Sequence, residues 1–327
     1  MKFKAKKRYF NLDNIKNKKT CPDFVKWTRG RLNRRGKREH LASRMRHVDR
    51  IEKLFLHTNR TETTISWIGH STFLIQMEGI NIVTDPVWAN FMGLQQRFTQ
   101  PGIELSDMPD VDIVLISHGH YDHLHFSSLQ QLTGNPLFLV PVGLQSLFQK
   151  KGIERVEQFS WWDQHKMGDV ELVFVPAQHW TKRTLWDRNT SHWGGWMIKK
   201  RVSGLNDTIA IYFAGDSGYF RGFREIGKRF NIDYALLPIG AYKPEWFNHL
   251  DHISPEEAVK AFLDLNAKSF IPMHYGAFKL ADDTPKEALE RLASEWRRLG
   301  LPQANLKMLK LGETLRCEKN DKLEEGS

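Results

Sequence analysis

The sequence is poor in cysteine and in long apolar runs. Its 327 residues include only two cysteines, Cys21 and Cys317, near opposite ends of the chain. A disulfide framework and an all-cysteine zinc site are therefore excluded, and a reducing compartment is expected. No apolar run is long enough to span a bilayer, and the basic start, Met1 to Arg8, is not followed by the apolar stretch of a secretory signal. These absences predict a soluble cytoplasmic protein.

Charge is distributed unevenly along the chain. Residues 1–60 contain 20 Lys and Arg against 5 Asp and Glu, whereas residues 61–327 contain 28 against 33. We therefore expect a basic N-terminal arm over 1–60, a globular domain over 61–317 and a polar tail over 318–327. The arm is either a solvated extension or a contact with an anionic surface, at the inner face of a membrane or on nucleic acid. Nucleic acid is the less favoured partner, because few aromatic residues are interleaved with the basic ones.

Short β-rich runs begin at residue 63. The runs 63–68, 72–77 and 80–84 are separated by turn signals and predict an antiparallel meander. In the arm, only 39–56 has the apolar spacing of a helix. Many strands with interspersed helices predict an α/β fold in which two sheets stack face to face with helices outside. The further strands expected are 113–117, 137–140, 156–159, 172–176, 195–199, 209–214, 235–239, 270–273 and 306–311, and the helices are 126–132, 143–151, 219–230, 255–266 and 285–299.

The most informative motif follows a predicted strand. Four apolar residues lead into the sequence Ser-His-Gly-His-Tyr-Asp-His, which ends at position 123. Because alternate residues of a strand share a face, His118 and His120 can bind one ion. A turn after them lets Asp122 and His123 reach a second ion. Imidazole and carboxylate donors suit Zn²⁺ better than Mg²⁺ or Ca²⁺, although Mn²⁺ or Fe can occupy the same ligands, and two such ions make hydrolysis the expected reaction class.

This motif resembles the His-x-His-x-Asp-His motif of the metallo-β-lactamase superfamily. That family completes its site with a histidine, a bridging aspartate and a second histidine, each after a later strand, and this sequence has His179, Asp216 and His274 in that order. The resemblance implies an αββα sandwich that binds two Zn²⁺ ions. It also implies that one ion is held by His118, His120 and His179 and the other by Asp122, His123 and His274, with Asp216 bridging them.

Further stretches carry a narrower resemblance. They are Trp-Ile-Gly-His-Ser-Thr at 67–72, Thr-Asp-Pro at 84–86, and the segments 178–185, 213–219 and 252–258. These stretches resemble the members of the superfamily that hydrolyse N-acylphosphatidylethanolamine as phospholipases D. The resemblance implies cleavage of a membrane phosphodiester to phosphatidic acid and an N-acylethanolamine. It further implies that Asp122 orients the attacking hydroxide and that His252 lies near the phosphate as a proton donor or charge stabiliser, whereas His70 is expected to be structural.

Tryptophan is frequent near the predicted site, and Trp186 and Trp246 fall on expected loops. Because tryptophan can line an acyl channel or lie at a lipid interface, these two residues and Tyr121 are candidate substrate-binding residues. The predicted function is a dinuclear zinc phosphodiesterase of phospholipase D type. Two alternatives stay open, a metal-dependent lactonase acting on a phosphorylated sugar lactone and a nuclease or binding protein that uses the arm to hold nucleic acid. The sequence does not define the oligomeric state.

Overall fold

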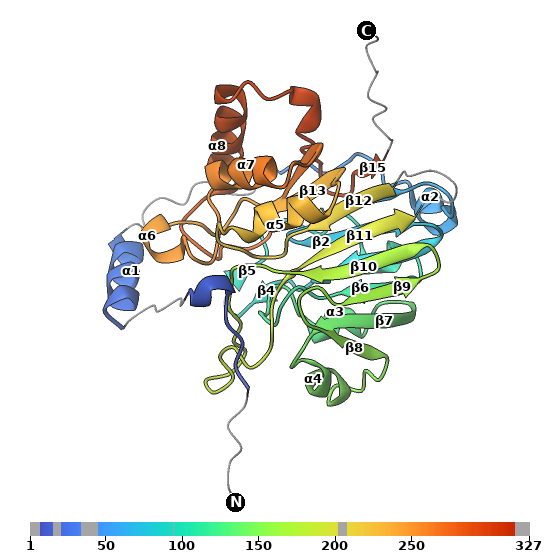
Figure 1. Cartoon of the computed structure of the whole chain (residues 1–327), viewed down its shortest axis with the longest axis horizontal. Helices are drawn as coiled ribbons and strands as arrows, with labels where there is room; N and C mark the ends of the chain where they lie inside the picture. Colours follow the sequence, from blue (N-terminus) through green and yellow to red (C-terminus); the bar gives the residue numbers. More distant parts are fainter. Residues whose placement is uncertain (1–6, 16–20, 34–44, 94, 202–207, 318–327) are drawn as a thin grey trace, which may run out of the picture.

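Two β-sheets packed face to face form the centre of the protein (Figure 1). The computed structural model describes residues 7–15, 21–33, 45–93, 95–201 and 208–317. The first sheet contains, from edge to edge, β15 (Thr314–Arg316), β1 (Thr64–Gly69), β2 (Thr72–Met77), β3 (Ile80–Thr84), β6 (Val111–Leu115), β7 (Gly134–Pro141) and β8 (Val156–Phe159). The second contains β14 (Ser269–Met273), β13 (Tyr234–Pro238), β12 (Thr208–Phe213), β11 (Gly195–Arg201), β10 (Val170–Val175) and β9 (Gln164–Met167).

Strands β1 and β2 are buried on both faces, which explains their nearly continuous apolar sequence. Trp67 and Phe73 point into the core between the two sheets, whereas Ile68 and Leu74 belong to a second core on the outer face of the first sheet. The predicted meander is confirmed, because β1, β2 and β3 pair antiparallel. Trp196 of β11 is fully buried, as expected for a core residue.

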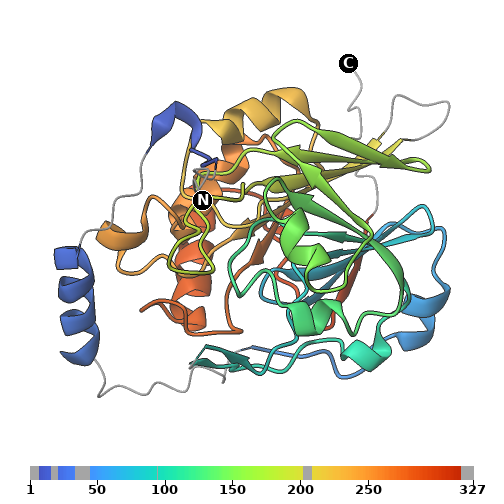
Figure 2. The same ribbon diagram turned by 90° about the horizontal axis from the view of Figure 1, so that it is seen from below.

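Helices cover the outer face of each sheet and give four layers (Figure 2). The first sheet is covered by α2 (Lys53–Thr58), α3 (Phe126–Leu129) and α4 (Gln145–Gln149), and the second by α5 (Gly222–Arg229), α7 (Pro255–Asp264) and α8 (Pro285–Arg298). Ile226, Val259 and Leu292 join α5, α7 and α8 to the core of the second sheet. The predicted αββα sandwich is confirmed. None of the described helices is both long and apolar enough to cross a membrane.

The described parts of the arm pack against the globular domain. Helix α1 (Cys21–Asn33) lies beside the short helix α6 (Glu245–Asn248), where the rings of Trp27 and Phe247 stack at 5.5 Å between centroids (Figure 1). Nearer the N-terminus, residues 12–14 form a single 3-10 turn.

The helix predicted over 39–56 is confirmed only at its end: residues 53–56 belong to α2, whereas the described residues 45–52 are not helical. The Val48 N–H donates to the Leu311 carbonyl, and the Leu311 N–H donates to the Arg46 carbonyl. Backbone groups committed to this neighbouring segment are not available to a helix. Residues 34–44 and the predicted polar tail, 318–327, lie outside the described residues.

Other expectations also need correction. Residues 306–311 are not a strand, because Leu306 bridges to Phe270 whereas Leu311 bridges to His47, and two different partners do not make a ladder. Helix α1 was not predicted, because only 39–56 was expected to be helical in the arm, yet it forms with Gly30 inside it. The short elements α6, β9, β15 and the hairpin of β4 (Phe91–Met92) and β5 (Gln95–Gln96) were not predicted, since two to four residues show no clear periodicity.

Candidate metal centre

All seven predicted metal ligands lie at one edge of the sandwich, just beyond the carboxyl ends of strands. The motif ending at His123 follows β6, His179 follows β10, Asp216 follows β12 and His274 follows β14. Strands β12, β13 and β14 are parallel, and β10 runs in the same direction because two antiparallel pairings separate it from β12. The fold therefore gathers ligands that are more than 150 positions apart in the sequence.

The first group consists of three histidines whose ring nitrogens converge. His118 Nε2 lies 2.9 Å from His120 Nδ1, and His179 Nε2 lies 3.2 Å from the same atom. A tetrahedral ion with Zn–N bonds of about 2.0–2.1 Å separates its ligands by about 3.3 Å. The three nitrogens are therefore already spaced as the ligands of one ion.

The second group combines carboxylate and imidazole donors. Asp122 Oδ2 lies 3.5 Å from His123 Nε2 and 3.5 Å from His274 Nε2. His70 Nε2 lies 3.2 Å from the same carboxylate oxygen, so His70 contacts a predicted ligand.

Asp216 lies between the two groups. Its Oδ2 is 3.1 Å from His123 Nε2, and its Oδ1 is 3.1 Å from His274 Nε2. The same Oδ2 is 3.9 Å from His118 Nε2 and 3.8 Å from His179 Nε2. One carboxylate therefore faces donors of both groups, which is the arrangement that a bridging ligand requires.

Burial sets the protonation state of the first group. It lowers the pKa of His118 well below the ordinary value, and it lowers the pKa of His120 to about 3 and of His179 to about 4, with the neighbouring imidazoles adding to the effect. Neutral imidazole is the form that ligates a metal ion. These three side chains are thus ready to bind a cation at neutral pH without first losing a proton.

The second group is built to hold positive charge. Burial alone would lower the pKa of His123 and His274, but the charge of Asp216 and contacts with Asp122 outweigh it, and the pKa of His274 rises to about 9. Although buried His123 Nε2 and His274 Nε2 each lie 3.1 Å from an Asp216 oxygen, neither nitrogen, nor Asp216 Oδ1, makes a hydrogen bond of acceptable geometry among the described residues. Orphaned donors of these types, at this spacing, fit a borderline divalent ion such as Zn²⁺.

A further set of residues holds the ligands in place. Asp85 Oδ2 accepts a hydrogen bond from the Ser117 hydroxyl at 2.6 Å, and the same oxygen lies 2.7 Å from His123 Nδ1. Ser117 Oγ in turn lies 2.9 Å from His118 Nδ1. Such contacts fix the tautomer and orientation of a metal-binding imidazole. Sequence reasoning missed Asp85 and Ser117, although the Thr-Asp-Pro and Ser-His strings that contain them were visible.

Three residues at this edge have left-handed backbone conformations that side chains other than glycine rarely adopt. The φ angles are 55° at His70, 35° at Asp85 and 61° at His274. The His274 N–H donates to the His70 carbonyl at 3.1 Å, so two of these turns support each other. Backbone strain of this kind is often concentrated at functional sites.

The loop that carries the histidine motif is clamped by Arg183. Its Nη1 donates to the carbonyls of Gly119 at 2.9 Å and Leu124 at 3.0 Å, and its guanidinium lies 4.1 Å from the centre of the Tyr121 ring. Tyr121, predicted to bind substrate, is exposed beside the site.

The remaining predicted site residues lie around the metal ligands or on the surface. His252 Nδ1 is 3.8 Å from Asp216 Oδ2, and the His252 side chain is 16% exposed. Trp186 is exposed on the loop that follows His179, and Trp246 is exposed on α6 with Lys26 Nζ 4.5 Å from its ring centre. The structure thus brings His252 to the ligands but shows no contact between them and either tryptophan.

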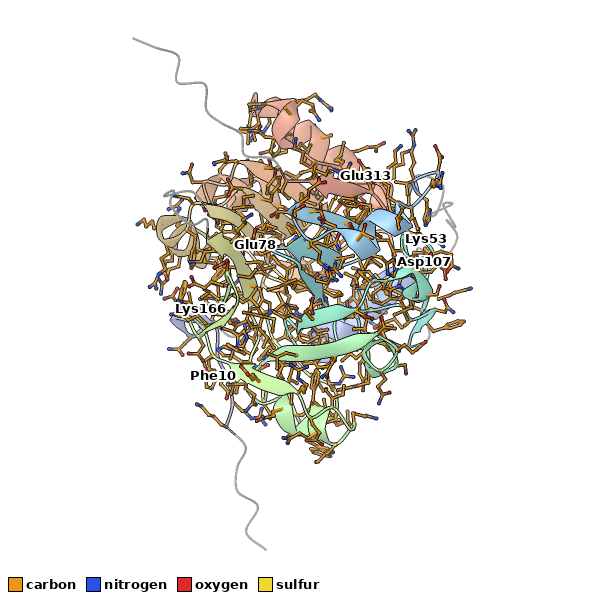
Figure 3. All side chains as sticks on the ribbon, turned by 90° about the vertical axis from the view of Figure 1, so that its right-hand side faces the viewer. Phe10, Lys53, Glu78, Asp107, Lys166 and Glu313 are labelled. Atoms are coloured by element: carbon orange, nitrogen blue, oxygen red, sulfur yellow. The ribbon has the colours of Figure 1, made fainter. Side chains whose placement is uncertain are left out.

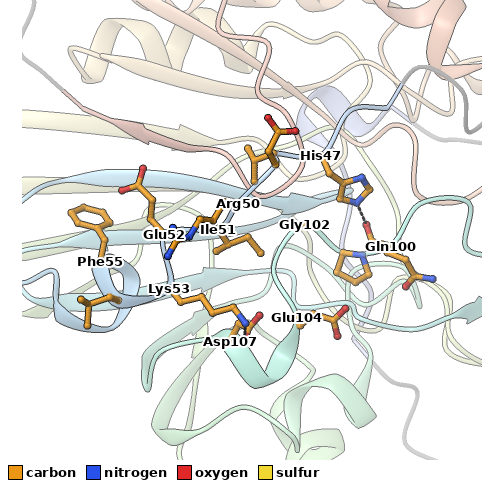
Figure 4. A pocket seen from close by; sticks show the side chains of 14 residues that line it. His47, Arg50, Ile51, Glu52, Lys53, Phe55, Gln100, Gly102, Glu104 and Asp107 are labelled. Carbon is orange, nitrogen blue, oxygen red and sulfur yellow. Dashed lines mark hydrogen bonds and ion pairs between the residues drawn. The ribbon is translucent and has the colours of Figure 1, made fainter.

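A groove elsewhere on the protein is a poor candidate for the site. It has a volume of about 1010 Å³ and is lined by residues 47–55 and parts of 100–107 (Figure 4). Two of its lining residues, Lys53 and Asp107, form an ion pair, with Lys53 Nζ 2.7 Å from Asp107 Oδ1 (Figure 3). None of the predicted site residues lines this groove, so its size does not outweigh the chemistry gathered at the other edge.

Comparison with known proteins identifies the family of the chain. A family model described as a beta-lactamase superfamily domain matches residues 80–275. N-acyl-phosphatidylethanolamine-hydrolyzing phospholipase D 1 of Caenorhabditis elegans is 34% identical over 251 residues, which cover 69% of this chain and 68% of that protein. A UPF0173 metal-dependent hydrolase of Methanopyrus kandleri is 30% identical over 227 residues, covering 68% of this chain and 88% of the relative.

Two relatives without an assigned activity and one solved structure are also similar to this chain. Uncharacterized proteins of Mycobacterium bovis and Mycobacterium tuberculosis are 36% identical to this chain over 241 residues. The match covers 70% of this chain and 62% of each relative, so the chain spans less than two thirds of their length. The solved structure of Igni18, a metallo hydrolase of Ignicoccus hospitalis, has a TM-score of 0.60 and 24% identity, covering 79% of this chain and all of that chain. The structural match supports the fold alone.

The chain belongs to the metallo-β-lactamase superfamily. Within it, the similarity to a protein named as an N-acylphosphatidylethanolamine-hydrolysing phospholipase D agrees with the narrower resemblance found in the sequence.

Proposed function

We propose that the chain is a dinuclear zinc phosphodiesterase of phospholipase D type that hydrolyses N-acylphosphatidylethanolamine or a related phospholipid. The observation that carries the proposal is the position of Asp216, whose carboxylate lies within 3.9 Å of imidazole nitrogens from both groups. One carboxylate can thus serve two ions. When bound, two Zn²⁺ ions supply a nucleophile that is active at neutral pH and neutralise charge on the phosphoryl group.

The chain's own residues have separate tasks in this hydrolysis. Asp122 orients the attacking water, whose oxygen forms a bond to phosphorus. The bond that breaks joins phosphorus to the ethanolamine oxygen, and His252 donates a proton to that leaving oxygen. The products are phosphatidic acid and an N-acylethanolamine. His252 is more exposed than the neighbouring ligands His179, Asp216 and His274, which suits a residue that meets both substrate and solvent.

Two observations favour a phospholipid over a lactone. The first is the activity that the C. elegans relative is named for, since 34% of the aligned residues are identical in the two chains. The second is the apolar tip of the loop 182–191, which follows His179 and exposes Leu185 by 78% and Trp186 by 83%. A sugar phosphate does not require such a tip, whereas a lipid surface accommodates it.

The substrate proposal is tested by product analysis in ¹⁸O-labelled water. The purified protein is offered N-acylphosphatidylethanolamine vesicles, a cyclic nucleotide and a phosphorylated sugar lactone, and the products are identified by mass spectrometry. We expect N-acylethanolamine without label and phosphatidic acid with one labelled oxygen, because the attack occurs at phosphorus. Lactone opening without phosphodiester cleavage would replace the proposal with the lactonase alternative, and cleavage of nucleic acid alone would favour the nuclease.

We further propose that the loop 182–191 contacts the membrane peripherally. Its exposed apolar tip is accompanied by Lys182 and Arg188, which suit an anionic lipid surface. The basic arm adds positive charge that would strengthen the same contact and make it sensitive to salt.

Replacing the tip residue tests this contact. Trp186→Ala is expected to reduce binding to anionic vesicles about tenfold, because a buried aromatic side chain contributes at least about 1.4 kcal/mol at an interface. Vesicle sedimentation measures the effect, and turnover of a soluble short-chain substrate should stay within twofold of the wild type. Leu263→Ala, at a 47% exposed leucine of α7, is the control. Equal binding by the wild type and Trp186→Ala would remove this loop from the membrane contact.

A further inference from the structure

A short segment of the basic arm, residues 7–15, lies directly on the loops that carry the metal centre. We call it the strap. The Tyr9 N–H donates to the Asn189 carbonyl at 2.9 Å, and the Tyr9 ring stacks on His192 with 4.6 Å between centroids. Further along, Asp13 Oδ2 accepts from Arg221 Nε at 2.7 Å. The strap is therefore attached at both ends to segments that follow β10 and β12.

Between these attachments, Asn11 is inserted into the protein. Its side-chain Oδ1 accepts a hydrogen bond from the main-chain N–H of His179 at 2.9 Å and a second from the Trp193 indole N–H at 2.9 Å. Asn11 is only 9% exposed, and Trp193 is 1% exposed. Because both partners are N–H donors, the amide oxygen, and not the amide nitrogen, must face them.

The contact matters because His179 is the only member of the first histidine group that comes from outside the His-Gly-His motif. Its ring is held on one side, where Nδ1 lies 3.0 Å from the Asp251 carbonyl. Its backbone is held on the other side by Asn11. Removing the Asn11 oxygen would leave a buried N–H without its partner at the ligand itself, and the loop would shift to find another.

We infer that Asn11 is a positioning residue of the metal centre, so that the arm completes the site that holds the first ion. The inference rests on the proposed dinuclear site. It gives the arm a role that its charge does not suggest, since the contact is made by a neutral amide. The neighbouring helix α1 reinforces the connection, because Trp27 stacks on Phe247 of α6, four residues before Asp251.

The test measures ion release, independently of turnover. The wild type and Asn11→Ala, each loaded with two equivalents of Zn²⁺, are titrated with a chromogenic chelator. We expect one of the two ions to be bound 10- to 100-fold more weakly by Asn11→Ala, as for other residues that orient a metal-binding histidine. Asn11→Asp keeps an oxygen at the same place and should restore affinity to within a few fold. With Co²⁺ in place of Zn²⁺, the absorption spectrum of the same ion should change in Asn11→Ala.

Two controls separate positioning from packing. Asn14→Gly changes an exposed strap residue whose φ of 52° suits glycine. Trp193→Phe removes the indole N–H that donates to Asn11 and to the Ala177 carbonyl, while leaving the contact between Asn11 and His179. Both should retain wild-type ion release. If Asn11→Ala does not fold, Asn11→Ser takes its place, because its shorter side chain does not reach the His179 N–H. Identical release from the wild type and the Asn11 variants, or equal weakening by Trp193→Phe, overturns the inference, whereas a wild type that takes up no Zn²⁺ contradicts the proposed function itself.

Discussion

Asp216→Ala is expected to lower turnover about 10³-fold or more and to leave fewer than two ions on each chain. The substitution removes the one carboxylate whose oxygens approach His123 and His274 at 3.1 Å while also facing the first histidine group. A loss of 10³-fold corresponds to about 4 kcal/mol of transition-state stabilisation, which is what removing a shared anionic ligand from two cations can cost. The substitution also removes the negative charge that raises the pKa of the buried imidazoles of His123 and His274.

Elemental analysis after exhaustive dialysis measures the ions, and hydrolysis of a phosphodiester measures turnover. Asp169→Ala is the matched control, because Asp169 is exposed in the turn between β9 and β10, and it should retain both ions and full turnover. An Asp216→Ala protein that keeps two ions and wild-type turnover would rule out a bridging role. A wild type with a single ion at full turnover would rule out the dinuclear site.

The candidate ligand set could be proposed from the sequence because a recognisable histidine motif led to a resemblance that implies the remaining members. The histidine motif follows four apolar residues, and His179, Asp216 and His274 each follow an apolar strand that ends at the same edge of the sandwich. Parallel β-strands deliver their carboxyl ends to one edge, so a polar residue after each strand is brought near the others. The choice of His179, Asp216 and His274 among the polar residues that follow strands came from the resemblance to the metallo-β-lactamase superfamily, and the structure places all three at this edge.

The residues that orient the ligands could not be predicted in the same way. Asp85 lies 38 positions before His123, and Asn11 lies 168 positions before His179, and neither position carries a periodic signal. Their contacts depend on how loops cross the edge, which tertiary packing decides. The contact between His70 and Asp122 could not be predicted either, because it depends on a left-handed backbone turn at His70 that the sequence does not signal.

The arm also makes contacts that its charge does not predict. Its basic residues suggested a surface contact, yet its described segments make specific neutral contacts with the domain, through Asn11 and through Trp27. A deletion of the whole arm would therefore disturb ion binding together with any membrane contact. Point variants such as Asn11→Ala and Trp186→Ala separate the two effects, since they affect different segments and are read by different measurements.

His252→Ala is expected to lower turnover of N-acylphosphatidylethanolamine about 10²- to 10⁴-fold while both ions are retained. His252 Nδ1 lies 3.8 Å from Asp216 Oδ2, and its ring centre lies 5.3 Å from that of His179. A general acid at this place assists departure of an ethanolamine oxygen, which is a poor leaving group, and such assistance is worth about this much. A p-nitrophenyl phosphodiester has a leaving group that needs no proton, so its hydrolysis should fall less than tenfold.

The leaving-group comparison distinguishes an acid from a ligand. His252, His179 and Asp216 together also have a spacing that could hold an ion. If His252 were a ligand, His252→Ala would lose an ion and both substrates would slow equally, and that outcome would contradict the acid role. His249→Ala, at an exposed histidine just after α6, should change neither ion content nor turnover. Loss of the alkaline limb of the pH–rate profile in His252→Ala, with the acidic limb unchanged, would identify the missing group as the proton donor.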